Sequence, residues 1–351
     1  MCRLEASFKK AQQIVQKLSV EGYKPRLART PVLVYTDIGR DVDDLEALTY
    51  LAGSPQIEIV GVVTTYMIPK VRAQIARAVL DSFDLSRVPV GIGSVFPLGS
   101  KGSVELRKYL VEHQIERVSY EGVGIITKRS KQPTTKGDKI IINAVKKYKD
   151  QLVIAVLAPP TDLARVILKK RVLFQKIAGF FFMGQALQEG GKLTPDPTAY
   201  NFAQDMVASR ILLELQDYVP MTFLTKFAAY ATPLNRTDFA QFEKTSHPVG
   251  KYLMIHAVKG LECFVKRAPD IFKRVFQIPA HEDANGAFLK LQKLSNPYDA
   301  LTVMAIVRPE LFSPVRVGMH KLIGLSLEYN GISNPAKVKS ELMNTMLNAL
   351  K

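Results

Sequence analysis

The fold of this chain is decided by the stretch Val34-Tyr35-Thr36-Asp37-Ile38-Gly39-Arg40-Asp41-Val42-Asp43-Asp44. It begins inside an apolar, β-branched run over 31–36 and leads into a helical pattern over 43–51. Gly39 allows backbone angles that other residues avoid, so the chain can turn sharply between the two. A buried strand followed at once by a turn and a helix is typical of a βα unit, which binds ligands at the carboxyl end of its strand.

Short apolar runs and helical patterns alternate along the rest of the chain. Further strands are predicted at 57–65, 88–92, 152–157, 177–183 and 219–224, and further helices at 71–82, 139–149, 160–169 and 205–215. Nearly continuous apolar runs are typical of strands buried on both faces of a parallel sheet. The sequence therefore predicts an α/β fold with a mostly parallel central sheet flanked by helices.

The chain is predicted to consist of two parts. Residues 1–30 read as a basic N-terminal helical extension, and residues 31–351 as a single α/β domain with a helical insertion near 236–294. Two polar, glycine- and proline-containing segments, 128–138 and 184–197, are predicted to be loops.

The net charge of +16 is concentrated in two stretches, 1–30 and 125–150, which together hold +11. Such patches attract nucleic acid or acidic partners, but no aromatic-interleaved RNA-binding motif accompanies them, which favours a solvated basic surface over a nucleic-acid partner. No run of about 18 apolar residues predicts a membrane span. Because Cys2 and Cys263 are the only cysteines, a reducing compartment, the cytoplasm, is the simpler expectation. The oligomeric state stays open, a homo-oligomer included.

Four aspartates lie within eight positions, at 37, 41, 43 and 44. Carboxylates packed this closely repel one another unless a cation compensates, and hard cations such as Ca²⁺ and Mg²⁺ take oxygen ligands of this kind. An alternative interpretation makes Asp41 the N-cap of the following helix, with Asp43 and Asp44 as acids in its first turn. That alternative leaves Asp37 unexplained, so the sequence favours a metal site.

The ordered set of segments resembles the inosine–uridine-preferring nucleoside hydrolases and their wider superfamily. The strand, turn and helix around Asp37 are the most specific part of the resemblance. The other matching segments follow in the family's order, at 60–65, 88–93, 156–164, 182–184, 199–205 and 297–300. The resemblance implies the open α/β sheet of that superfamily and covers most of the chain beyond residue 31.

The resemblance also implies a metal ion and its ligands. The ion would be Ca²⁺ rather than Mg²⁺, bound by Asp37, Asp44, Asp299 and the carbonyl oxygen of Leu157. Asp37 would in addition be the base that takes a proton from the attacking water.

Substrate contacts are implied at five further positions. Asp43 would hold a ribose hydroxyl, Asn201 would contact the sugar, and Met183 lies in a matching pocket segment. Lys192 lies near a sugar-binding asparagine of the family, where its charge would attract an anionic group. Tyr298 stands in place of the histidine associated with leaving-group protonation and is the candidate proton donor.

Several positions depart from the family pattern. Tyr35 replaces a leading aspartate, Pro69 replaces a ribose-binding asparagine, and Ala199 replaces a ribose-binding glutamate. The implied metal ligands are thus retained while the ribose-binding side chains are altered.

Three functions are compatible with this pattern. The sequence favours a Ca²⁺-dependent hydrolase that cleaves the N-glycosidic bond of a nucleoside or related ribosyl compound with an altered sugar pocket. The alternative is a non-catalytic, metal-containing ligand-binding protein on the same fold. A metal-dependent glycosyl or phosphoryl transferase using Asp41-Val42-Asp43 is disfavoured, because no glycine loop that would cradle phosphate is present.

Overall fold

The computed structural model describes residues 29–39, 41–98, 135–267, 269–276 and 278–351. The predicted N-terminal extension, apart from its last two residues, and the basic segment 128–134 lie outside this range.

Nine strands of the described residues form one sheet in the order β12-β13-β9-β6-β5-β1-β2-β3-β4. Every neighbouring pair is parallel except β12 and β13, so the predicted mostly parallel α/β sheet is confirmed. The strands are β1 (Thr30–Thr36), β2 (Ile57–Thr64), β3 (Val90–Ile92), β4 (Thr135–Lys136), β5 (Val153–Val156), β6 (Gly179–Met183), β9 (Met221–Leu224), β12 (Val315–Val317) and β13 (His320–Ile323).

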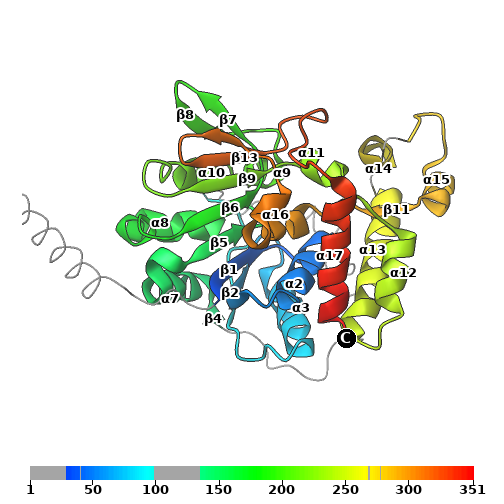
Figure 1. Cartoon of the computed structure of the whole chain (residues 1–351), viewed down its shortest axis with the longest axis horizontal. Coiled ribbons are helices and arrows are strands. Elements are labelled where there is room, and N and C mark those ends of the chain that lie inside the picture. The colour runs from blue at the N-terminus through cyan, green and yellow to red at the C-terminus, as the bar shows by residue number, and fades with distance from the viewer. Residues whose placement is uncertain (1–28, 40, 99–134, 268, 277) are drawn as a thin grey trace, which may run out of the picture.

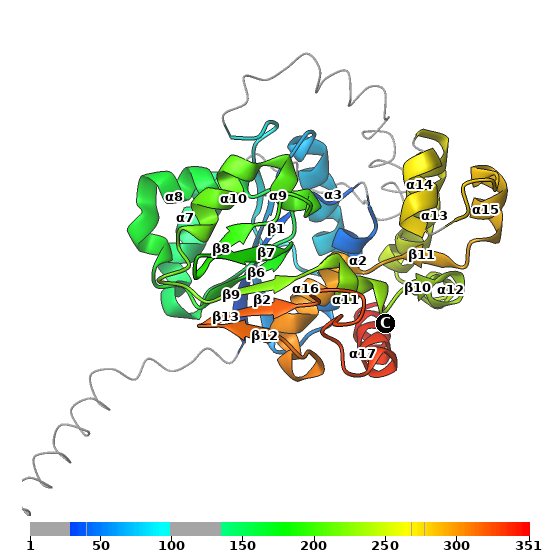
Figure 2. The same ribbon diagram turned by 90° about the horizontal axis from the view of Figure 1, so that it is seen from above.

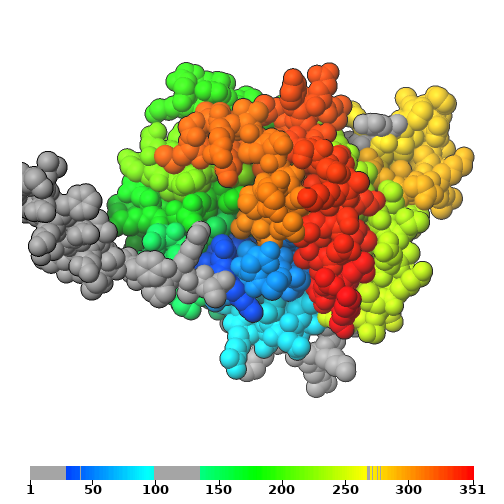
Figure 3. All heavy atoms as spheres, viewed as in Figure 1, coloured from blue at the N-terminus to red at the C-terminus, as the bar shows by residue number. Residues whose placement is uncertain are grey.

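Helices cover both faces of this sheet, as Figures 1 and 2 show. One face carries α7 (Gly137–Tyr148), α8 (Thr161–Phe174) and α10 (Met206–Leu213). The other carries α2 (Asp43–Ala52), α3 (Pro69–Ser82), α16 (Tyr298–Val307) and α17 (Pro335–Ala349). In Figure 3, α17 forms an outer surface of the molecule beside α16.

The alternation of side chains along β1 explains why its sequence is continuously apolar. Val32 and Val34 belong to the core under α2 and α3, whereas Leu33 and Tyr35 belong to the core under α7 and α8. All four side chains are fully buried. A strand covered by helices on both faces has no side that faces solvent, so its residues do not alternate between apolar and polar.

The six strands and five helices predicted from the sequence are all present. Their ends differ most at α8, which continues past a kink at Lys170 to Phe174. The prediction of a loop over 184–197 is wrong, because β7 (Ala186–Glu189) and β8 (Lys192–Pro195) pair there as an antiparallel hairpin. Gly190 and Gly191 have positive φ, as a two-residue hairpin turn requires. In the described part of 128–138, β4 and the start of α7 replace the predicted loop.

The segment after β9 is mostly helical and returns the chain to the centre of the sheet. It contains α11 (Lys226–Tyr230), β10 (Leu234–Asn235), α12 (Arg236–Glu243), α13 (Pro248–Arg267), α14 (Pro269–Phe276), α15 (Ala284–Lys290) and β11 (Lys293–Ser295). Phe239 of α12 and Tyr252 of α13 belong to the same core as α2. From β11 the chain enters α16, which packs against α2. None of the helices that the structure describes is long and apolar enough to span a membrane.

Candidate active site

The aspartates of the quoted stretch lie at the carboxyl end of β1, in the middle of the sheet. Asp37 directly follows the strand, and Asp43 and Asp44 occupy the first turn of α2. The N-cap of this helix is Val42, and Asp41 is exposed, so the alternative interpretation of Asp41 as the N-cap is wrong. Gly39 has φ +118°, a conformation that favours glycine.

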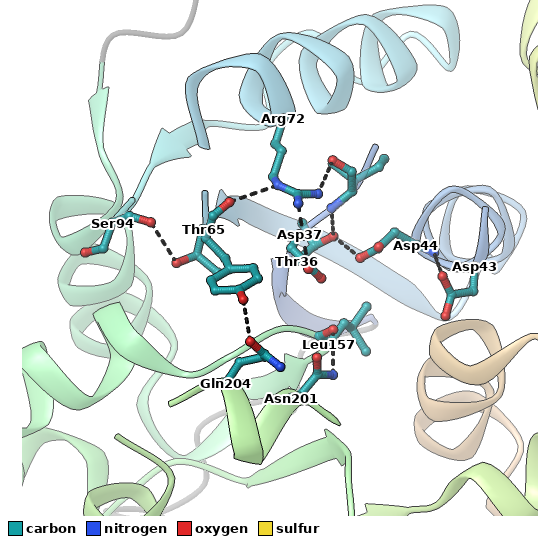
Figure 4. Close-up of polar contacts among 12 residues, drawn as sticks. Thr36, Asp37, Asp43, Asp44, Thr65, Arg72, Ser94, Leu157, Asn201 and Gln204 are labelled. Carbon is teal, nitrogen blue, oxygen red and sulfur yellow. Dashed lines mark hydrogen bonds and ion pairs between the residues drawn. The ribbon is translucent and has the colours of Figure 1, made fainter. Parts of the chain in front are cut away.

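Asp299 joins this group from the far end of the sequence. It lies in the first turn of α16, whose packing against α2 brings it to Asp43 and Asp44. Each of the three offers a carboxylate oxygen, and these atoms lie within 4.8 Å of one another. Thr36 donates its hydroxyl hydrogen to Asp44 (Figure 4). Three buried carboxylates at this spacing form a donor set suited to a hard divalent cation.

Burial and mutual repulsion disfavour the charged form of all three carboxyls. Burial, followed by the neighbouring charge of Asp37, raises the pKa of Asp44 to about 8, against the hydrogen bond from Thr36. Burial, followed by repulsion from the other aspartates, also raises the pKa values of Asp43 and Asp299 well above the ordinary range. The cluster therefore takes up protons when no cation is bound.

These shifts predict how stability depends on pH. Because the folded pKa of Asp44 is about 8 and the unfolded one near 4, the folded state binds more protons between these values, and ion-free stability falls as pH rises through them. We expect the melting temperature of the protein in chelator to fall from pH 5 to pH 8, and the increase on adding Ca²⁺ to grow over that range. An ion-free melting temperature that rose from pH 5 to pH 8 would contradict the expectation.

Asp37 lies beside Arg72 rather than inside the group of three. The Arg72 guanidinium is 3.9 Å from Asp37 Oδ2 and donates 3.0 Å hydrogen bonds to the carbonyl oxygens of Ile38 and Tyr66 (Figure 4). Asp37 also lies close enough to Asp44 for its charge to contribute to the raised pKa of Asp44. Asp37 thus lies next to the group formed by Asp43, Asp44 and Asp299, and the buried Arg72 lies beside it.

Asn201 lies at the ends of β5 and β6. Its Nδ2 donates to the carbonyl oxygen of Leu157 at 3.0 Å and to that of Met183 at 3.2 Å. The Leu157 N–H in turn donates to the Tyr35 carbonyl, which places Leu157 beside the end of β1. A carbonyl oxygen has two lone pairs, so Leu157 retains one acceptor site. Three predicted site residues are therefore brought together at the carboxyl edge of the sheet.

Tyr298 lies next to Asp299 and is surrounded by polar and aromatic groups. Asn296 donates from Nδ2 to the Tyr298 hydroxyl at 3.2 Å, and the Tyr230 ring lies 6.2 Å away. Burial, followed by the charge of Tyr230, raises the Tyr298 pKa well above its usual value, against the hydrogen bond from Asn296. Tyr298 is therefore protonated near neutral pH and can donate its hydroxyl hydrogen.

Three further positions from the sequence analysis belong to other elements. Lys192 is exposed at the turn of the β7–β8 hairpin. Pro69 is the first residue of α3, and Ala199 precedes the short helix α9 (Tyr200–Gln204). Neither of the last two has a side-chain hydrogen-bonding group.

Two functional positions were missed by the sequence analysis. Arg72 is 1% exposed in the first turn of α3, where the helix dipole disfavours a cation. Asp162 is buried and accepts hydrogen bonds from Tyr35, Thr65 and Ser94, which lie at or just beyond the ends of β1, β2 and β3. Arg72 could have been found from the sequence, because a cation in the first turn of a helix is unusual. The sequence held no such signal for Asp162, because its hydrogen-bond partners come from distant segments.

The chain was compared with known proteins. The model of the family described as inosine-uridine preferring nucleoside hydrolase matches residues 32–339. No curated protein matches the sequence significantly. Among solved structures, the type III effector protein XopQ complexed with adenosine diphosphate ribose is similar, with a TM-score of 0.77 and 23% identity over 97% of this chain and 98% of that chain.

Two similar structures are nucleoside hydrolases by name. The purine-preferring ribonucleoside hydrolase from Gardnerella vaginalis has a TM-score of 0.67 and 19% identity over 91% of this chain and 99% of that one. The inosine-uridine preferring nucleoside hydrolase from Bacillus anthracis has a TM-score of 0.54 and 15% identity over 91% and 99%. At these identities the likeness shows a common fold.

Proposed function

Because the chain belongs to the inosine-uridine preferring nucleoside hydrolase family, we propose that it hydrolyses the N-glycosidic bond of a nucleoside or related ribosyl compound with a Ca²⁺-activated water. The observation that carries the proposal is the convergence of Asp299 with Asp43 and Asp44, which the sequence separates by most of the chain. The small number of cysteines supports a cytoplasmic protein.

The residues present fit a divalent cation. Asp43, Asp44 and Asp299 supply buried carboxylate oxygens, whose pKa values are raised by burial and then by the charges of neighbouring aspartates. Asp37 and the Leu157 carbonyl lie at the same edge and would complete an all-oxygen set, which suits Ca²⁺. When bound, such an ion lowers the pKa of a coordinated water and orients it for attack.

Asp37 is the base of the proposed reaction. It is less buried than the other acids of the site, with 17% of its side chain exposed. A carboxylate at the open side of the site can reach a water and the substrate, and it accepts the proton that the water loses on attack. Asp43 and Asn201 are proposed to hold the sugar.

Tyr298 is the proposed proton donor to the departing base. Its hydroxyl oxygen accepts a hydrogen bond from Asn296, which leaves the hydroxyl hydrogen available for another acceptor. The raised pKa makes the phenol a weak acid, so transfer becomes favourable only as negative charge develops on the leaving nitrogen.

Replacing Tyr298 with phenylalanine removes this hydrogen and little else. We expect kcat on a nucleoside to fall about a hundredfold, within the range typical of general acids. Hydrolysis of p-nitrophenyl riboside, whose leaving group needs no proton, should change by less than about threefold. Equal losses on both substrates, measured by released base and by released nitrophenol, would count against Tyr298 as the donor.

The sugar pocket is proposed to differ from that of ordinary ribonucleoside hydrolases. Pro69 and Ala199 offer no hydrogen bond to a sugar hydroxyl, and each unsatisfied group costs about 1–3 kcal/mol. Two such losses weaken binding or transition-state stabilisation by about two to four powers of ten. An anionic group on the substrate, attracted by Lys192, would offset part of this.

The alternative function, a ligand-binding protein without catalysis, is favoured by the same two substitutions. The deciding experiment incubates the protein and Ca²⁺ with inosine, uridine, adenosine, their 5′-monophosphates and adenosine diphosphate ribose, and measures released base by chromatography. Base release that disappears in Asp37→Ala supports the hydrolase. Binding without release from any compound supports the binding protein.

A further inference from the structure

Arg72 is the one buried cation that the described residues place against the aspartate site. Its side chain is 1% exposed and comes from the first turn of α3, opposite the turn that carries Asp37. Two of its nitrogens donate to backbone carbonyls, of Ile38 and Tyr66, which fixes the guanidinium in place. A helix start disfavours positive charge, so this placement needs a compensating negative partner.

The negative partners are the carboxylates of the site. Arg72 Nη2 lies 3.9 Å from Asp37 Oδ2. In contrast, the carboxylates that lie within 4.8 Å of one another are those of Asp43, Asp44 and Asp299, without Asp37. The structure thus divides the acidic residues into three that face one another and a fourth that faces an arginine.

We propose that Arg72 is a built-in counter-cation that competes with the divalent ion for Asp37, so that the site stays folded without the ion and binds it weakly. This inference rests on the proposed metal site, and it assigns Arg72 a role in setting ion affinity. Arg72 touches neither reacting atoms nor substrate and is a positioning residue.

The Arg72 guanidinium and the divalent ion both carry positive charge. A guanidinium and a divalent ion that share the same carboxylate repel each other, and buried charges at about 4 Å interact far more strongly than exposed ones. Removing the guanidinium charge removes this repulsion, so the ion competes with one fewer cation for Asp37. It also removes the positive charge that offsets part of the negative charge of the aspartates in the ion-free protein.

The test uses Arg72→Gln, which removes the charge and keeps an N–H donor at the position of Nε, toward the Tyr66 carbonyl. Titration with Ca²⁺ alone, followed by calorimetry, should show an affinity at least about tenfold higher than that of the wild type, about 1.4 kcal/mol. Without the ion the variant should melt lower than the wild type, and Ca²⁺ should raise its melting temperature by more. Arg72→Lys, which keeps the charge, should bind Ca²⁺ within about threefold of wild type.

Arg77 provides a matched control in the same helix. It is buried, donates to the carbonyl oxygens of Val88 and Leu85 and pairs with Asp81 at 2.7 Å. Arg77→Gln therefore loses a similar set of contacts away from the aspartates. We expect it to lower the melting temperature and to leave Ca²⁺ affinity within about threefold.

The outcomes separate this inference from the proposed function. Wild-type Ca²⁺ binding with equal or weaker binding in Arg72→Gln overturns the competition and leaves the hydrolase proposal standing. Binding by Arg72→Gln but not by the wild type supports the competition and contradicts the Ca²⁺-dependent function. Loss of folding in Arg72→Gln that saturating Ca²⁺ fails to rescue, with Arg72→Met behaving alike, overturns the inference, because the role of Arg72 would then be packing.

Discussion

Substituting Asp37 by asparagine is expected to lower kcat by about a hundredfold to ten-thousandfold, the range typical of a lost general base. Asparagine has nearly the same shape and keeps one oxygen for a cation, so the change removes proton acceptance while sparing the turn. Asp37 directly follows β1, and its 17% exposure gives a water access to the carboxylate. The measurement is the steady-state rate of base release at saturating Ca²⁺ with the best substrate of the panel.

Asp41→Asn is the matched control for this prediction. Asp41 lies in the same turn but is exposed, so its replacement should leave kcat within about threefold. A rate for Asp37→Asn within about tenfold of wild type, at full Ca²⁺ occupancy, would remove Asp37 from the role of base.

Asp299→Asn is expected to weaken Ca²⁺ binding about a hundredfold to a thousandfold. The estimate follows from losing one full charge at close range to a divalent ion in a buried site, discounted for a partly polar surrounding. The same substitution relieves repulsion between Asp299 and its neighbours Asp43 and Asp44, which lie within 4.8 Å. In chelator the variant should therefore melt higher than the wild type, and calorimetry with thermal unfolding measures both effects.

The opposite signs of these two effects identify a metal site. A carboxylate with a purely structural role would, on replacement, lower stability whether or not Ca²⁺ is present. Asp41→Asn should change neither quantity. If Asp299→Asn bound Ca²⁺ as tightly as the wild type, the three-carboxylate site would be ruled out as the place where the ion binds.

Much of the fold could be predicted because the strand pattern of each apolar run in the sequence matches its burial on both faces of the sheet. The run 31–36 is apolar on both faces, and β1 has helices on both sides. The hairpin over 186–195 was missed because one glycine pair is compatible with both a loop and a two-residue turn. Residue periodicity can be read from a single segment, but the pairing of two short polar strands cannot.

By itself the sequence determined the α/β class, the position of the acidic turn at the end of β1 and the candidate ligands on that turn. These three features follow from residues that are close together in the sequence, because strands, turns and helices have characteristic local patterns of apolar residues and glycine. The resemblance implied that Asp299 joins Asp44, but only the tertiary structure decided that Asp299 also meets Asp43 and that Asp37 faces Arg72. Both contacts join segments that are separate in the sequence, and they depend on how α2, α3 and α16 pack at one edge of the sheet. Charge acts through space, so the burial of each carboxylate and the effects of Arg72 and Asp299 on Asp44 come from that packing and add to the effects of nearby aspartates in the sequence.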